Sequence, residues 1–196
     1  LLDLAKKAAI AGAAEIMEVY QGEFEVVEKE DQSPLTIADQ RSNEVIEKLL
    51  KPSGIPILSE EGIHSSFEER KSFTYLWIVD PLDGTKEFVK KNGEFTVNIA
   101  LVENGIPILG VIYVPVKKWM YFGSSAGSFR EVGGSREKLP LNIKKEVFTA
   151  VGSRSHPSKE TADFFEQLKK EKGNVEVVSM GSCLLYTSPS PRDMWT

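Results

Sequence analysis

This sequence has little cysteine and no excess of positive charge. Its one cysteine, Cys183, excludes an internal disulfide and a thiolate metal site, so nothing indicates an oxidising compartment. Lysine and arginine number 24 against 29 aspartates and glutamates, and the resulting net charge of -5 argues against a surface for nucleic-acid polymers. A small anionic substrate would therefore need a metal ion or backbone amides to bind it.

Long hydrophobic runs are also missing. No apolar segment approaches the roughly 20 residues of a membrane-spanning helix, and no charged-then-apolar leader opens the sequence. We therefore expect neither secretion nor membrane insertion, and we predict a cytoplasmic location, with a peripheral place on the cytoplasmic membrane face left open. Because Leu1 already lies in an apolar helical pattern, we expect the natural start to lie upstream. The oligomeric state is left open.

The spacing of apolar residues predicts a mixed α+β arrangement. Intervals of three and four predict core-facing helices over 2–20 and 36–50. Shorter apolar runs predict strands, and residues 103–105 (ENG) predict a hairpin turn. The predicted strands are 24–27, 55–58, 75–79, 95–102, 106–113, 119–122 and 128–132. The middle of the chain is therefore expected to form an antiparallel sheet that packs against paired helices.

The pattern changes near residue 147 and divides the chain. A strand there, a helix over 159–170 and a strand over 175–178 indicate the start of an α/β lobe. The last residues have no periodicity and contain SPSPRD. We expect a metal-binding α+β lobe over 1–145, an incomplete α/β lobe over 146–182, and a non-native, disordered tail over 183–196.

Two carboxylates three positions apart mark residues 80–85 (DPLDGT). Hard divalent cations prefer carboxylate and carbonyl oxygens, so Asp80, Asp83 and the carbonyl of Leu82 form a plausible half of a magnesium cage. The segment follows an apolar run, and we expect it to be a loop at the end of a strand. Gly84 permits close approach of the backbone, and a helix or turn that starts after it would direct its amides at a phosphate oxygen.

Taken singly, these acids also have ordinary explanations. The Asp-Pro segment could be a capped turn. Asp39, three positions after Thr36, is close to a capping box, which would stabilise a helix by about 1 kcal/mol without catalysis. Glu61, beside Glu60, could simply be solvated. Together they carry more weight, because Glu60 and Asp80 each follow a predicted buried strand, where acids suit a metal site better than a core.

Four segments resemble the inositol-monophosphatase-like superfamily of metal-dependent, lithium-sensitive phosphatases, over about residues 1–182. They are 31–39 (DQSPLTIAD), 58–62 (LSEEG), 77–88 (WIVDPLDGTKEF) and 152–156 (GSRSH). Within the superfamily they are most similar to 3'(2'),5'-bisphosphate nucleotidases of the bacterial CysQ type, because KEF stands where inositol monophosphatases usually have TNF. The resemblance implies a layered α/β/α/β sandwich of the sugar-phosphatase type, in the α+β class.

The resemblance also implies roles for the acids. Asp39 and Thr85 would orient and deprotonate a metal-bound water for in-line attack, and no covalent enzyme intermediate is needed. Lithium and calcium are expected to inhibit. The ligands of two or three magnesium ions would be Glu60, Asp80, Asp83 and the carbonyl of Leu82.

The implied substrate is a nucleotide bisphosphate. Gly84 and Thr85 would bind the scissile phosphate through backbone amides, and the reaction would convert adenosine 3',5'-bisphosphate to AMP and phosphate, recycling a by-product of sulfate assimilation. His156 stands before a proline and also fits an ordinary surface histidine. The nucleotide side of the pocket would comprise Ser153, Ser155, His156, Gly181 and Ser182.

Two other functions stay open. One is inositol monophosphatase or fructose-1,6-bisphosphatase activity on the same fold. The other is an inactive fragment that binds metal or nucleotide, because family members continue into a segment whose Trp-Asp motif completes the metal site. Here Asp193 and Trp195 stand in the wrong order, and residues 183–193 resemble translated vector sequence. We therefore expect one metal ligand and one wall of the cleft to be missing.

Overall fold

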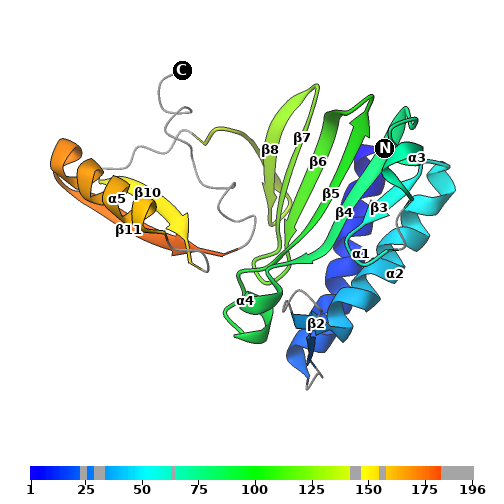
Figure 1. Ribbon diagram of the computed structural model, residues 1–196, viewed down its shortest axis with the longest axis horizontal. Coiled ribbons are helices and arrows are strands. Elements are labelled where there is room, and N and C mark those ends of the chain that lie inside the picture. Colours follow the sequence, from blue (N-terminus) through cyan, green and yellow to red (C-terminus); the bar gives the residue numbers. More distant parts are fainter. Residues whose placement is uncertain (23–25, 29–33, 63–64, 142–146, 155–157, 182–196) are drawn as a thin grey trace.

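Two bodies of unequal size make up the computed structural model (Figure 1), which describes residues 1–22, 26–28, 34–62, 65–141, 147–154 and 158–181. We call the larger body the sheet lobe and the smaller one the C-terminal unit. The helices of the sheet lobe are α1 (Leu2–Gln21), α2 (Ile37–Leu50), a 3-10 turn η1 (Lys51–Ser53), α3 (Phe67–Arg70) and α4 (Thr85–Val89). Its strands are β1 (Val26–Glu28), β2 (Pro34–Thr36), β3 (Ile57–Ser59), β4 (Tyr75–Asp83), β5 (Thr96–Glu103), β6 (Ile106–Val114), β7 (Trp119–Ser124), β8 (Gly127–Val132) and β9 (Ser135–Lys138). The C-terminal unit comprises β10 (Phe148–Ser153), α5 (Lys159–Lys172) and β11 (Val175–Met180).

A seven-stranded sheet with the order β3-β4-β5-β6-β7-β8-β9 forms the centre of the sheet lobe. The five pairs from β4-β5 to β8-β9 are antiparallel, as predicted, whereas β3 pairs with β4 in parallel. The hairpin between β5 and β6 turns through Asn104 and Gly105, which both have positive φ. This is the conformation that favours an Asn-Gly pair in a two-residue hairpin loop, so the predicted turn is confirmed.

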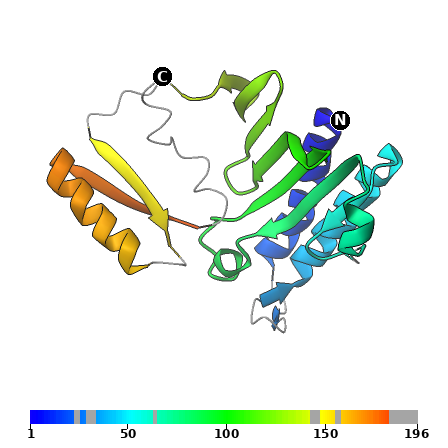
Figure 2. The ribbon, with the colours of Figure 1, turned by 45° about the horizontal axis from the view of Figure 1, so that its top comes forward.

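Helices α1 and α2 cover one face of the sheet (Figures 1 and 2). The inward face of α1 is rich in alanine, and a Cβ placed on Gly12 would lie 2.7 Å from both the Ser42 hydroxyl and the Ile46 methyl of α2. The two helices therefore approach too closely at this point for a larger residue. Both helices lie within a residue of their predicted bounds.

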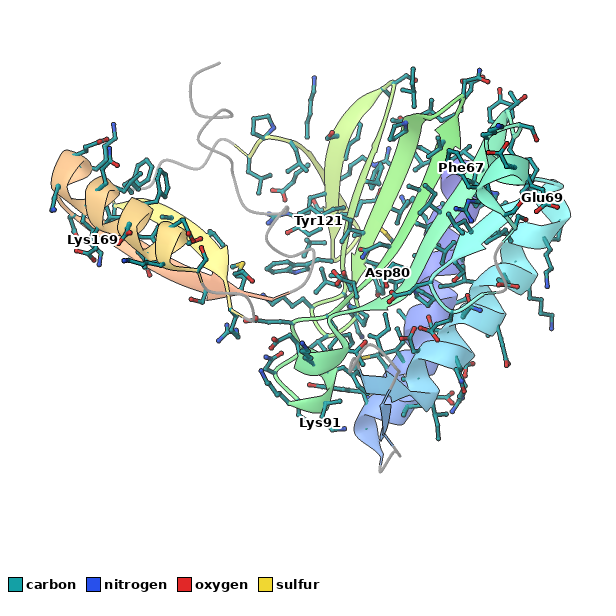
Figure 3. All side chains as sticks on the ribbon, viewed as in Figure 1. Phe67, Glu69, Asp80, Lys91, Tyr121 and Lys169 are labelled. Atoms are coloured by element: carbon teal, nitrogen blue, oxygen red, sulfur yellow. The ribbon has the colours of Figure 1, made fainter. Side chains whose placement is uncertain are left out.

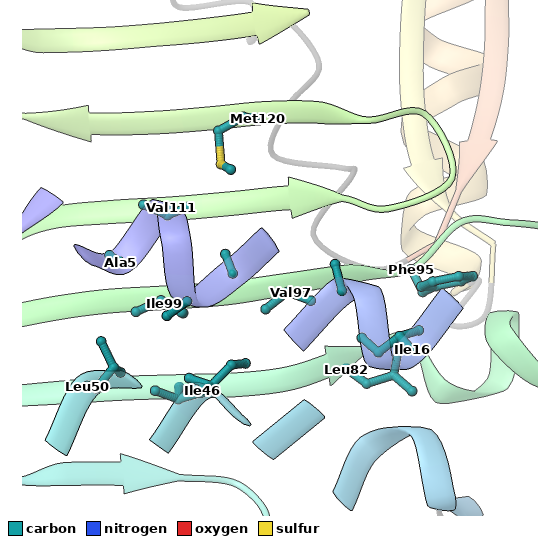
Figure 4. Close-up of a cluster of buried hydrophobic side chains, with 14 of the residues drawn as sticks. Ala5, Ile16, Ile46, Leu50, Leu82, Phe95, Val97, Ile99, Val111 and Met120 are labelled. Atoms are coloured by element: carbon teal, nitrogen blue, oxygen red, sulfur yellow. The ribbon is translucent and has the colours of Figure 1, made fainter. Parts of the chain in front are cut away.

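The hydrophobic core lies between these helices and the sheet (Figure 4). Trp77, Leu101 and Val97 are fully buried strand residues, and Ile16 and Ile46 bury the facing sides of the two helices. Full burial of side chains of this size contributes about 1.5–3 kcal/mol each in transfer free energy. This core supports the C-terminal end of β4.

The C-terminal unit is a βαβ unit, as the sequence predicts. Strands β10 and β11 pair in parallel, and α5 connects them. The Ser158 hydroxyl accepts a hydrogen bond from the Thr161 backbone amide (3.2 Å) and caps the start of α5. The helix itself has no buried residue in the described part of the chain, and Phe164 is 55% exposed.

Some elements were not predicted, and some predicted segments lie outside the described residues. Strands β2 and β9 and helix α3 were not predicted, although Ser66 and Glu69 form a capping box at the start of α3. The predicted strand at 24–27 and the tail at 183–196 fall wholly or partly outside the described residues. No helix in the described ranges is both long and apolar enough to cross a membrane.

Candidate active site

The DPLDGT segment is the bulged end of a strand, not the loop that we predicted. Asp80 pairs with Asn98 of β5, but the next partners are Asp83 and Thr96, so β4 has one residue more than β5 over this interval. Such a β-bulge tolerates Pro81, which has no N–H to donate to the ladder. It also increases the local twist and changes the direction of the side chains around it. Figure 3 shows Asp80 in the part of β4 that leads toward α4.

Parallel pairing of β3 with β4 brings the second predicted acid to the same place. Ser59 pairs with Val79, and the backbone N–H of Glu60 donates to the Val79 carbonyl (3.1 Å). Because parallel strands end at the same edge of a sheet, Glu60 follows β3 directly beside Asp80 on β4. The pairing thus places two acids that are 20 positions apart in the sequence at the same end of neighbouring strands.

The carboxyl group of Asp80 lies in an environment that disfavours its charge. Burial, together with the smaller effect of the negative charges of Asp83 and Glu60, raises the pKa of Asp80 to about 7. Hydrogen bonds from the Asn98 side chain and the Leu82 backbone oppose the shift only in part. The buried Oδ1 of Asp80 has no hydrogen-bond partner among the described residues. The surroundings of Asp80 therefore leave the negative charge of its carboxylate largely uncompensated.

A chain of contacts from β5 holds the acids. The fully buried Thr96 donates through its hydroxyl to the Asn98 Oδ1 (3.0 Å), and its Oγ1 lies 3.4 Å from the Asp83 Oδ2. Asn98 then bonds to Asp80. Thr96 and Asn98 on β5 thus orient the carboxylates of Asp83 and Asp80.

The donor chemistry fits a divalent cation. A hard cation would satisfy the Asp80 Oδ1 and offset the repulsion between the three carboxylates, and oxygen ligands are those that magnesium prefers. Within the described ranges, no three carboxylate, imidazole or thiol side chains are already gathered into a group that could hold a metal ion. The carbonyl of Leu82, the other predicted ligand, lies 3.3 Å from the Thr85 hydroxyl, which donates to it.

Gly84 and Thr85 form the start of α4, as predicted. Gly84 has φ 91° and ψ 40°, a left-handed conformation that a side chain would strain. Its carbonyl accepts the backbone N–H groups of Glu87 and Phe88 (both 2.9 Å). The chain therefore reverses sharply from the bulge into a short helix, which places Thr85 next to the carboxylates.

Asp39 lies in the first turn of α2 and is 2% exposed. The capping-box alternative for Asp39 involves Thr36, whose side chain lies outside the described residues. Burial to this degree is unusual for an acid whose only partner would be a helix terminus. A role for Asp39 in the site stays a prediction.

Two polar residues that sequence analysis missed connect α2 to the acid-bearing strands. The Ser42 hydroxyl donates to the Pro81 carbonyl (3.0 Å), and the Ser59 hydroxyl donates to the Asn43 Oδ1 (2.5 Å). Both Ser42 and Asn43 are buried. A signal was present in the sequence, because they stand three and four positions after Asp39 and continue its helical face toward the core.

Two residues of the KEF segment, Glu87 and Phe88, face inward on α4, whereas Lys86 is exposed. Phe88 is fully buried, and its ring centroid lies 5.1 Å from that of Tyr20 and 5.2 Å from that of Phe95. Glu87 is 1% exposed and accepts a hydrogen bond from the Asn92 side chain. Both residues thus serve the packing of the loop that follows the acids.

The residues predicted for the nucleotide side are only partly described. Ser153 ends β10 and pairs with Met180 of β11, so it lies beside Gly181 at the same end of the parallel pair. The Gly181 backbone N–H donates to the Glu94 Oε2 (2.9 Å). Ser155, His156 and Ser182 lie outside the described residues.

A model of the inositol monophosphatase family matches residues 1–187 of the sequence. The chain belongs to this family. It is 42% identical over 175 residues to the 3'(2'),5'-bisphosphate nucleotidase CysQ of Salmonella typhimurium, an alignment that covers 87% of this chain and 69% of that relative. Against the enzyme of the same name from Escherichia coli K12 the identity is 39% over 196 residues, covering 92% of this chain and 77% of the relative.

Solved structures agree with this assignment. CysQ from Bacteroides thetaiotaomicron superposes with a TM-score of 0.81 at 43% identity, covering 94% of this chain and 73% of that one. An IMPase from Thermotoga maritima superposes with a TM-score of 0.72 at 26% identity, covering 94% of this chain and 69% of that one. The predicted family and α+β fold class are confirmed, and membership implies a divalent metal cofactor.

Proposed function

We propose that this protein is a magnesium-dependent 3'(2'),5'-bisphosphate nucleotidase that converts adenosine 3',5'-bisphosphate to AMP and phosphate. One observation carries the proposal. The bulged end of β4 and the end of β3 bring Asp80, Asp83 and Glu60 to the same end of the sheet, in a chain about 40% identical to enzymes of that name. The family contains phosphatases for other substrates, so the nucleotide specificity rests on those relatives.

Magnesium fits the oxygen-rich strand end. Glu60, Asp80, Asp83 and the Leu82 carbonyl would hold it, and we propose two or three ions. When bound, such ions lower the pKa of coordinated water and neutralise charge on a phosphate. Lithium and calcium are the proposed inhibitors.

The side chains around the acids have proposed roles in the hydrolysis. Asp39, buried at the start of α2, accepts the proton of the attacking water, and the Thr85 hydroxyl orients that water. The hydrogen bond from Thr85 to the Leu82 carbonyl holds this hydroxyl near the bulge. Backbone amides of Gly84 and Thr85 bind the scissile phosphate, because the left-handed turn at Gly84 starts α4 directly after the carboxylate of Asp83.

The two bodies have different roles in the proposal. The segment 1–145 supplies the metal site, and the segment 146–182 supplies contacts to the nucleotide through Ser153, Ser155, His156, Gly181 and Ser182. The residues after 182 have no proposed role. A cytoplasmic location stays a prediction that rests on the single cysteine.

Phosphate release tests the proposal directly. The chain is given adenosine 3',5'-bisphosphate, inositol 1-phosphate and fructose 1,6-bisphosphate, each with magnesium and with a chelator. We expect release from the nucleotide to be the fastest and to stop when the chelator is added. Clear preference for the inositol or fructose substrate would overturn the proposed specificity.

The inactive-fragment alternative needs a separate measurement. Calorimetric titration of the same chain with magnesium and with AMP reports binding whether or not turnover occurs. Binding of both without phosphate release would contradict the proposed activity and support the alternative.

A further inference from the structure

Glu94 joins the sheet lobe to the C-terminal unit. It lies in the loop between α4 and β5, and its carboxylate accepts hydrogen bonds from the Arg154 Nε (3.0 Å) and Nη2 (2.6 Å). The same carboxylate accepts the backbone N–H of Gly181 (2.9 Å). One side chain of the sheet lobe therefore contacts the ends of both β10 and β11, which Figure 2 shows reaching toward α4.

Arg154 completes this contact from the opposite side. Its Nη2 also donates to the Ser179 carbonyl of β11 (2.7 Å), and its own backbone N–H donates to the Met180 carbonyl (2.9 Å). The guanidinium thus ties the two strand ends of the C-terminal unit to each other and to Glu94. A two-pronged contact of this kind fixes orientation as well as distance.

A second contact between the two bodies is steric. A Cβ placed on Gly181 would lie 2.7 Å from the Cγ and 3.0 Å from the Cδ of Glu87, which is 1% exposed on α4. A Cβ contact of 2.7 Å is too short, so a side chain at this position would either displace the Glu87 side chain or separate the two bodies. The strand end that carries Gly181 is therefore pressed against the helix that follows the metal-binding segment.

Asn92 orients Glu87 and Glu94, the two acids of the sheet lobe that take part in this contact. Its Nδ2 donates to Glu87 and its Oδ1 accepts the backbone N–H of Glu94 (2.9 Å). One amide side chain therefore orients both acids that meet the C-terminal unit. This loop has its shape independently of Arg154, because these bonds lie within residues 87–94.

We propose that Glu94 and Arg154 form an ionic clasp that sets the position of the nucleotide-binding strand ends relative to the phosphate-binding turn. Glu94 and Arg154 are positioning residues in this proposal. The clasp fixes the distance from the turn at Gly84 and Thr85 to the strand ends at Ser153 and Gly181. The proposal rests on the proposed function, which places a phosphate at one of these points and the nucleotide at the other. A substrate that spans the two points needs this separation to be held before it binds.

Two variants that break the clasp test it, Glu94→Ala and Arg154→Ala, together with the double variant. We expect the KM for adenosine 3',5'-bisphosphate to rise about tenfold in each, because a misplaced binding group loses affinity for the whole substrate. The value of kcat is expected to change much less, because the acids on β3 and β4 are untouched. The double variant should match the singles instead of multiplying them, as expected for residues that act as one unit.

Conservative and remote variants separate positioning from general stability. Arg154→Lys keeps the charge without the two-pronged contact, so its KM should lie between the wild-type and Arg154→Ala values. The matched control is Glu137→Ala, which removes an ion pair of the same kind, with Arg130 Nε and Nη2 at 3.1 and 2.7 Å, on the β8-β9 hairpin. Its KM should equal that of the wild type.

Amide exchange provides a readout that needs no substrate. In the full chain, exchange of the Gly181 N–H with solvent should accelerate at least about tenfold in Glu94→Ala, because this amide loses its acceptor. Unchanged exchange would overturn the clasp itself. Faster exchange with an unchanged KM would overturn its role in positioning. If the wild-type chain shows no nucleotide hydrolysis at all, the proposed function fails, while the exchange result still decides whether the clasp exists.

Discussion

The sheet lobe and the C-terminal unit are stabilised in different ways. In the sheet lobe, residues from α1, α2, β4 and β5 are fully buried in one continuous cluster. In the C-terminal unit, α5 buries no residue in the described chain, and the buried residues of β10 are Ala150 and Gly152. The unit meets the sheet lobe through polar contacts at Glu94, close packing at Gly181 and the packing of Met180 against the hydrophobic cluster of Val114 and Tyr121. A large buried core thus supports the acids directly, whereas the proposed nucleotide contacts depend on a small number of polar and apolar contacts.

The two bodies therefore suit two different requirements, one for holding the acids and one for binding the nucleotide. Like charges held together, as at Asp80, need a rigid frame, because the frame must resist their repulsion. A surface that admits and releases a nucleotide has no such requirement. The comparison can be tested by making matched changes in the two bodies.

The largest contrast is expected between two Asp-to-Asn changes. Asp80→Asn should lower kcat/KM on the order of 10³-fold, because it removes a carboxylate from the proposed metal site. Asp163→Asn, on the exposed side of α5, should leave it unchanged. Steady-state phosphate release measures both.

A second readout of Asp80→Asn checks the physical reason. Because burial and neighbouring charges disfavour the ionised group, Asp80→Asn should raise the thermal midpoint of the metal-free protein while activity is lost. A lower midpoint would show that Asp80 is stabilising in its own right and that the charges around it are compensated.

Truncation of buried and exposed side chains should differ strongly in stability. Leu101→Ala empties a fully buried position on β5 and should lower the free energy of unfolding by about 2–5 kcal/mol. Phe164→Ala removes a larger side chain from α5, but that side chain is 55% exposed, so the loss should stay within about 0.5 kcal/mol. Urea unfolding gives both values. Equal losses would mean that the C-terminal unit has its own well-packed core.

An added methyl group tests how tightly each body is packed. Gly12→Ala should lower the free energy of unfolding by about 1–3 kcal/mol although alanine favours a helix, because its Cβ would meet two side chains of the buried α2. Gly152→Ala meets the Phe165 ring at 2.8 Å, but this ring lies on an exposed helix that can shift. The expected loss is therefore smaller. A reversed order, measured by thermal unfolding, would contradict the comparison.

The smallest effect is expected from the hydroxyl groups that hold backbone segments. Ser42→Ala removes the bond to the Pro81 carbonyl in the bulge and should lower activity about tenfold, as removal of a ligand-orienting partner typically does. The control Ser53→Ala removes a bond from the Trp77 indole (3.1 Å) that is remote from the acids. It should alter stability and leave activity intact.

Periodicity predicted most elements of this fold, because the helices and strands alternate apolar and polar residues in the usual way. The bulge at Asp80 was not predictable, since it depends on the register between β4 and β5 and not on β4 alone. Ser42 and Asn43 were missed because their partners are 39 and 16 positions away. For the same reason, Glu94 drew no attention, although its acidic side chain links segments 60 and 87 positions apart.

The acids could be singled out in the sequence because the resemblance implied roles for them. That Glu60 lies beside Asp80 could not be predicted, because it depends on the parallel pairing of β3 with β4. A short strand such as Ile57–Ser59 gives no sign of its direction in the sequence. Tertiary pairing decides it.

The edges of the seven-stranded sheet have a consequence for the behaviour of this protein in concentrated solution. Strand β3 is three residues long, and β9 at the other edge carries Ser135, Arg136, Glu137 and Lys138, all exposed. Short edges and edges with charged side chains resist pairing with a strand from another molecule. The sheet is thus protected at both sides against growth into intermolecular aggregates, even though its inner strands are rich in β-branched residues.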